Sequence, residues 1–127
     1  MEGDHDPFAR LREICMAFPE AEEEPFGGHT APSWRVRTKI FAMGSDGTGR
    51  EAVNFKAAPG AQEILVGAAP ERFYRPAYIG HKGWVGAWLD AGEVDWDELA
   101  GLIDESYRLI APKRLVQQMI RGASPDR

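Results

Sequence analysis

Only one cysteine, Cys15, occurs in the 127 residues, so the chain can form neither an internal disulfide nor a cysteine-based metal site. The sequence contains no run of about 18 consecutive apolar residues, and no basic start leads into an apolar segment. We therefore expect a cytoplasmic protein with neither a signal peptide nor a membrane span.

The motifs of the common catalytic centres are also missing. There is no phosphate-binding loop ending in Lys-Ser/Thr, no dinucleotide fingerprint and no nucleophile elbow. Of the three histidines, His5 lies in an N-terminal tail, and His29 and His81 have no third metal ligand at a recognisable spacing. We therefore expect no metal and no cofactor, and we favour a binding protein over an enzyme.

What is present suffices for one folded domain. The chain is 43% hydrophobic, and a domain of this length buries roughly two thirds of the surface of its unfolded chain. We expect a single domain over residues 1–127, with frayed tails at about 1–5 and 121–127.

Charge is distributed unevenly along the chain. The net charge is −5, which argues against tight nonspecific binding of nucleic acid. Residues 1–28 carry −6 and residues 89–127 carry −3, whereas residues 29–88 carry +4. A basic central segment between acidic flanks fits an anion-binding surface, and it equally fits strands whose outer faces are solvated by Arg and Lys.

Helices are predicted near both ends of the chain and once in the middle. Asp6 and Pro7 start a helix with an apolar face over residues 7–18, which places Cys15 in a packing role. Pro59 opens a short helix to about Val66. The remaining helices are predicted over residues 96–110, capped by Asp95, and from Pro112 onward.

Strands fill most of the segment between the helices. Alternating patterns predict them over residues 34–37, 39–43, 51–56 and 84–89, and the Glu22–Glu24 run reads as an exposed strand or turn. The first two form a hairpin whose turn, Arg37-Thr38, lacks the usual Gly or Asn. Residues 69–83 are expected to be irregular. The pattern predicts an α+β fold, a two-layer sandwich with an antiparallel sheet of about five strands and helices packed on one face.

The segment Tyr78 to Gly86 is the densest in residues that can bind a ligand. His81, Lys82 and Trp84 stand among glycines that let backbone N–H groups approach an anion. The alternative is a glycine-dependent turn with Trp84 packed and His81 exposed. With the basic strand residues included, the candidate anion- or DNA-binding residues are Arg35, Arg37, Lys39, Lys56, His81, Lys82 and Trp84.

Five segments, distributed from residue 11 to residue 113, together resemble the MmcQ/YjbR family. They are Leu11-Arg12-Glu13-Ile14-Cys15, Pro25-Phe26-Gly27-Gly28-His29, Lys39-Ile40-Phe41-Ala42, Gly80-His81-Lys82-Gly83-Trp84-Val85 and Ser106-Tyr107-Arg108-Leu109-Ile110-Ala111-Pro112-Lys113. The resemblance implies a bacterial protein with a two-layer fold similar to frataxin-like and secretion-chaperone-like domains. That family is often labelled DNA-binding, and the resemblance implies no catalytic residues.

Three hypotheses of function remain open. The first is a module that binds DNA or another anionic ligand, supported by the basic segment and by the possible exposure of Trp34, Trp84 and Trp88. The second is a protein-interaction or chaperone-like domain that uses an open sheet face. The third is a small-molecule site or enzyme around His29, Lys56 and His81. Neither the oligomeric state nor a membrane contact is indicated by any of these patterns.

Overall fold

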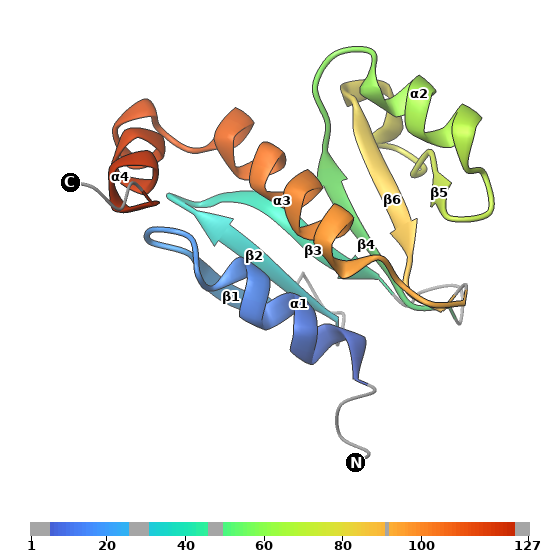
Figure 1. Cartoon of the computed structure of the whole chain (residues 1–127), viewed down its shortest axis with the longest axis horizontal. Helices are drawn as coiled ribbons and strands as arrows, with labels where there is room; N and C mark the ends of the chain where they lie inside the picture. Colours follow the sequence, from blue (N-terminus) through green and yellow to red (C-terminus); the bar gives the residue numbers. More distant parts are fainter. Residues whose placement is uncertain (1–5, 26–30, 46–49, 91, 124–127) are drawn as a thin grey trace.

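A computed structural model of the chain describes residues 6–25, 31–45, 50–90 and 92–123 (Figure 1). Within these ranges the chain forms four α-helices and the 3-10 helix η2: α1 (Pro7–Cys15), α2 (Ala61–Ala68), η2 (Gly80–Lys82), α3 (Trp96–Ile110) and α4 (Lys113–Ala123). The strands are β1 (Glu22–Pro25), β2 (Pro32–Val36), β3 (Lys39–Ser45), β4 (Ala52–Lys56), β5 (Phe73–Tyr74) and β6 (Trp84–Trp88).

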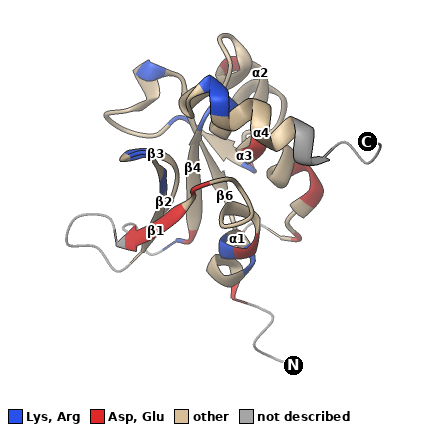
Figure 2. Cartoon of the chain, turned by 90° about the vertical axis from the view of Figure 1, so that its left-hand side faces the viewer, with Lys and Arg blue, Asp and Glu red and all other residues tan. Residues whose placement is uncertain are grey.

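The strands form one antiparallel sheet in the order β1-β2-β3-β4-β6-β5. Figure 2 shows α1, α3 and α4 on one side of the strands, which confirms the predicted α+β architecture. The sheet has six strands where about five were expected, and the short strand β5 falls in a segment expected to be irregular. Two residues are too few to show a period of two, so the sequence pattern could not reveal this strand.

Side-chain caps define the starts of two helices. The Asp6 carboxylate accepts a hydrogen bond from the Phe8 amide at 3.0 Å, and Asp95 accepts one from the Glu98 amide at 3.0 Å. Both caps are as predicted, and α3 spans the predicted residues 96–110. Helix α1 ends at Cys15, three residues before the predicted end. Phe18 nevertheless reaches the core, where its ring stacks on Tyr107 at 4.8 Å between centroids.

The β2–β3 hairpin turns at Arg37-Thr38, as predicted. Val36 pairs with Lys39, so the loop between the strands has two residues. Their φ angles are +51° and +70°, the sign that a type I′ turn requires at both positions. A side chain with a Cβ costs about 1–2 kcal/mol in this region, so the turn is strained.

The core lies between the sheet and α1, α3 and α4. Trp34 belongs to it and is fully buried, which corrects the expectation that this ring could be exposed. A β-bulge interrupts the pairing of β2 with β3. Trp34 pairs with Ala42 and Arg35 pairs with Ile40, so Phe41 is the extra residue of β3. Phe41 and Ala42 are both buried as a result.

Beyond the bulge, α3 inserts a side chain between β3 and β4. The last paired residues there are Ala42 and Phe55. One step further, the buried Ser106 hydroxyl donates to the Phe41 carbonyl at 2.7 Å and accepts from the Lys56 amide at 3.0 Å. The two strands therefore separate toward the end of the sheet that carries Lys39 and Lys56.

In the described ranges no helix has both the length and the apolar character needed to cross a bilayer.

Candidate functional site

The predicted basic residues divide between two turns at the same end of the sheet. β2 ends and β3 begins at the hairpin turn, while β4 ends and β6 begins beside η2. Arg35, Arg37 and Lys39 belong to the hairpin. Lys56, His81, Lys82 and Trp84 gather at η2, so the structure does not bring all seven together.

Carboxylates of the acidic N-terminal segment engage the arginines of the hairpin. Arg37 makes a two-point contact with Glu20, at 2.6 Å from Nε and 3.2 Å from Nη2. Arg35 Nε lies 3.6 Å from Glu24 Oε1. The hydrogen bond from Arg37 lowers the pKa of the Glu20 carboxyl, so this pair stays ionised at neutral pH. Lys39 is exposed.

At η2, a basic side chain of the predicted set contacts a backbone carbonyl instead of a carboxylate. Lys56 Nζ donates to the Lys82 carbonyl at 2.7 Å, which ties the end of β4 to the turn. His81 and Lys82 are exposed, and Gly83 ends the turn with φ of +90°. In the ranges that the structure describes, no ion pair with a carboxylate engages any of these three basic residues.

A polar cavity of about 200 Å³ opens beside η2, and we call it the α2–η2 pocket. Its charged and titratable lining residues are Arg75, His81 and Glu63. The rest of the lining is mostly backbone and small side chains: Ala58, Pro59, Gly60, Gln62, Gly80 and Gly83. The pocket therefore combines the side chains of Arg75 and His81, and the carboxylate of Glu63, with the glycine backbone that the sequence indicated.

Gln62 holds the pocket together, although it is not among the site residues predicted from the sequence. Its side chain is 6% exposed. The amide nitrogen donates to the Gly80 and Trp84 carbonyls, each at 2.7 Å, and the amide oxygen accepts from Arg75 Nη1 at 3.4 Å. One side chain thus joins α2, η2 and β6. The available signal was weak: Gln62 and Glu63 are two adjacent polar residues in the otherwise apolar Ala61–Val66 segment.

Arg75 was also missed, since it lies in the segment expected to be irregular. Its aliphatic stem packs directly over Gly80: a Cβ at that glycine would lie 2.5 Å from Arg75 Cγ. Glycine is therefore required at position 80 for Arg75 to lie across the turn. With the stem held and the guanidinium next to Gln62, Arg75 is positioned at the cavity while it remains exposed to solvent.

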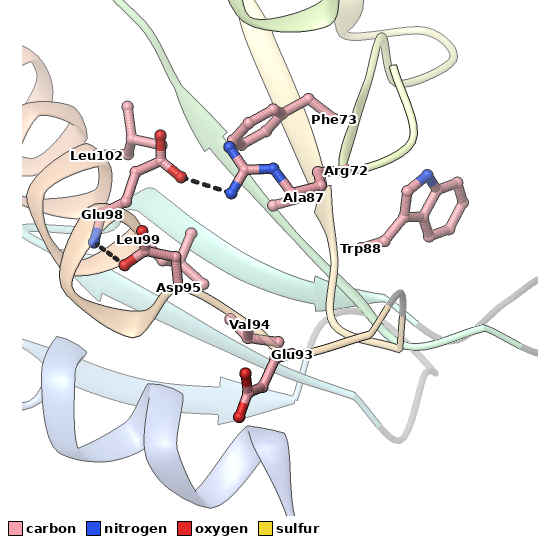
Figure 3. A pocket seen from close by; sticks show the side chains of 10 residues that line it. All are labelled: Arg72, Phe73, Ala87, Trp88, Glu93, Val94, Asp95, Glu98, Leu99 and Leu102. Carbon is pink, nitrogen blue, oxygen red and sulfur yellow. Dashed lines mark hydrogen bonds and ion pairs between the residues drawn. The ribbon is translucent and has the colours of Figure 1, made fainter. Parts of the chain in front are cut away.

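A second depression lies between β5, β6 and the start of α3, and its volume is about 20 Å³ (Figure 3). Arg72 and Glu98 form an ion pair at 2.9 Å across it, and Leu99 and Leu102 line its floor. A volume this small holds about one water molecule. It offers no room for a ligand.

The sheet face opposite α1 and α3 carries an aromatic stack rather than an open apolar patch. The Tyr74 ring lies over Gly86 and stacks on Trp88 at 4.3 Å between centroids. The Arg50 guanidinium covers Trp88 at 3.7 Å and pairs with Asp90. Trp84 and Trp88 are half-buried. These contacts already occupy the aromatic surface that the protein-interaction hypothesis requires.

Metal binding and thiol chemistry find no support in the described part of the chain. No group of three His, Cys, Asp or Glu side chains there could hold a metal ion. Cys15 is buried, as predicted, and desolvation raises the pKa of its thiol. His29, invoked in the small-molecule hypothesis, lies outside the described residues.

Comparison with known proteins identifies a family, and it finds relatives and a crystal structure that are similar to this chain. A family model described as YjbR matches residues 16–109. The "Uncharacterized protein YjbR" of Escherichia coli K12 is 29% identical over 101 residues, covering 79% of this chain and 83% of that protein, and the O157:H7 protein gives the same values. The crystal structure of Deinococcus radiodurans protein DR2400, with family-model domain DUF419, has a TM-score of 0.72, 22% identity, and coverage of 86% of this chain and 84% of that one.

Proposed function

This chain belongs to the YjbR family, and we propose that it is a binding module for phosphate-bearing or other anionic ligands, with the α2–η2 pocket as its site. The observation that carries the proposal is the position of Arg75. Its guanidinium lines a cavity, is oriented by Gln62, and has no carboxylate partner among the described residues. A guanidinium can bind a phosphate through two parallel hydrogen bonds, which makes Arg the preferred residue for such sites.

Neighbouring groups add to the attraction for an anion. His81 lines the same cavity, Lys82 belongs to the turn that borders it, and Lys56 at the end of β4 donates a hydrogen bond to that turn. Glu63 also lines the pocket, and no ion pair joins it to Arg75 or His81 within the described ranges. A cavity of about 200 Å³ lies below the roughly 300–1,000 Å³ typical of drug-sized ligands. Its size therefore suits a single anionic group better than a whole bulky ligand.

In an extended form of the same proposal, the ligand is duplex DNA. A duplex that bridged both turns would add Lys39 and Arg37 to the contacts, but Arg37 would have to leave Glu20 first. With a net charge of −5, the acidic flanks also repel phosphates. We therefore expect DNA affinity to be modest and to fall steeply as salt increases.

Two arginine variants test the site. Inorganic phosphate and a duplex oligonucleotide would each be titrated into wild type, Arg75→Gln and the matched control Arg37→Gln at low and moderate salt. Arg75→Gln should weaken phosphate binding about tenfold, because one charge-assisted contact is lost. Arg37→Gln should leave phosphate affinity unchanged.

The double variant Lys56→Ala/Lys82→Ala addresses DNA separately. Each phosphate contact that it removes should reduce the slope of log affinity against log salt by about 1. The proposed site is wrong if phosphate fails to bind wild type at low salt, or if Arg37→Gln and Arg75→Gln weaken it equally. DNA binding that is unaffected by the double variant contradicts the extended form alone.

A further inference from the structure

One aromatic side chain, in the segment that supplies Arg75, Gly80 and His81 to the pocket, is almost entirely exposed. Tyr78 has 92% of its surface accessible to solvent, and it belongs to the segment between β5 and β6. Buried aromatic rings dominate core energetics, so a ring with this exposure adds little to the stability of the fold. The core already contains Phe18, Phe41 and Tyr107 in mutual contact.

The backbone at Tyr78 is held in an unfavourable conformation. Its φ is +70°, and the Ile79 amide donates to the Ala77 carbonyl at 2.7 Å across it. That is the hydrogen bond of a γ-turn with positive φ at its central residue, a rare and strained form. A second bond, from the Gly80 amide to the Pro76 carbonyl at 2.9 Å, closes the loop around it. A strained residue maintained by its surroundings is a reason to look for function.

Tyr78 lies close to the α2–η2 pocket along the chain. Gly80 and His81, two and three residues later, line the pocket, and so does Arg75, three residues earlier. Two residues span at most about 7 Å of extended chain. The Tyr78 Cα therefore lies within about 7 Å of the Cα of Gly80, which lines the pocket. The backbone that carries the exposed ring therefore lies near the site that we assign to phosphate.

We propose that the α2–η2 pocket and Tyr78 together bind a nucleoside phosphate, with the phosphate at Arg75 and His81 and the base stacked on the Tyr78 ring. This inference rests on the proposed function and adds the ligand class. A flat ring stacks on any base, while Arg75 and His81 require the phosphate, so neither a nucleoside nor inorganic phosphate alone fills both parts. A free nucleotide and a nucleotide unit of a single strand share this chemistry.

The test compares ligands that contain one part or both. Inorganic phosphate, adenosine, adenosine 5′-monophosphate and a short deoxyadenosine single strand would be titrated into the protein. Adenosine monophosphate should bind roughly tenfold more tightly than phosphate, as expected for one stacked base. A preference for the strand over the free nucleotide would support the same chemistry and identify the strand as its source.

Variants at position 78 separate stacking from charge. Tyr78→Ala should reduce the affinity for adenosine monophosphate to that for phosphate, and Tyr78→Phe should keep it. The matched control is Ile64→Ala, which removes an exposed apolar side chain from α2. It should leave the affinities for adenosine monophosphate and for phosphate unchanged.

Three results would overturn the inference. If the nucleotide binds no more tightly than phosphate, or if Tyr78→Ala leaves its affinity unchanged, the inference fails while the phosphate site stands. If wild type self-associates through Tyr78 and shows no preference for the nucleotide, the ring belongs to a protein interface instead. If phosphate itself does not bind, the proposed function fails as well.

Discussion

The hairpin turn at Arg37-Thr38 and the η2 turn lie at the same end of the sheet and carry the same kind of charge, yet they use it differently. Carboxylates of residues 20–24 engage the hairpin arginines. At η2 the polar partners of Lys56 and Arg75 are a carbonyl and an amide. A local excess of basic residues therefore identifies an anion site only after the ion pairs within the protein have been counted.

The largest difference between the turns should be that the η2 turn depends for its stability on one buried side chain, that of Gln62. Gln62→Leu removes the hydrogen bonds to the Gly80 and Trp84 carbonyls and should lower the free energy of unfolding by about 2 kcal/mol. The control Gln117→Leu, at an exposed position of α4, should change it little. Urea unfolding of both variants is the measurement. Equal effects would show that Gln62 does not hold the η2 turn in place.

Acid should weaken the hairpin side of the molecule first. The Glu23 carboxylate accepts hydrogen bonds from Arg12 at 2.7 and 2.9 Å and from the Trp34 indole at 3.0 Å, and the Arg12 bonds lower its pKa most. Because this pKa is lower in the folded than in the unfolded chain, the stabilisation is complete above the unfolded value and disappears as pH falls through the folded one.

Glu23→Gln isolates this contribution. It should cost about 1 kcal/mol at neutral pH, after allowance for partial exposure of the pair to solvent, and almost nothing at a pH below the folded pKa. Unfolding curves across the acid range would show the two proteins converging. Parallel curves would mean that Glu23 does not titrate with folding.

Backbone strain offers a smaller contrast with opposite signs at the two turns. Thr38 has a φ of +70°, so Thr38→Gly should raise the free energy of unfolding by about 1 kcal/mol. Gly83 has a φ of +90°, so Gly83→Ala should lower the free energy of unfolding by about 1 kcal/mol. This cost comes from the backbone conformation, because the atom nearest to a Cβ there is the Ala57 carbonyl oxygen at 3.6 Å. Thermal unfolding of both variants tests the pair, and a destabilised Thr38→Gly would contradict the assigned turn.

The smallest effect is expected for the exposed Arg37–Glu20 pair. Arg37→Gln should leave the unfolding midpoint within error of wild type, because solvent screens such pairs and ordering two long side chains opposes them. A clear fall in the unfolding midpoint would mean that the Arg37–Glu20 pair also stabilises the fold.

Local patterns predicted the long elements of this fold well. Helix α3 matched its prediction because fifteen residues with an apolar face and an Asp cap leave little choice. The hairpin was identified from strand alternation even though its turn residues are unfavourable. The predicted middle helix began two residues early, since Pro59 and Gly60 precede α2.

Features that depend on tertiary contacts were missed. No local signal reveals that Glu20 reaches Arg37, seventeen residues later, so the basic segment looked more uniform than it is. Alternation assigns Trp34 and Arg35 to opposite faces but cannot say which face is the core. Gln62 and Arg75 become functional candidates only when α2 packs against η2, and that contact joins residues 18 positions apart.

Mapping phosphate binding on the amide spectrum is the most direct test of the difference between the two turns. Addition of inorganic phosphate to the ¹⁵N-labelled protein should shift the amide signals of Gly80, His81 and Gly83 and the Arg75 side-chain signal, and leave those of Arg37, Thr38 and Lys39 in place. Shifts centred on the hairpin, or no shifts at millimolar phosphate, would contradict the account.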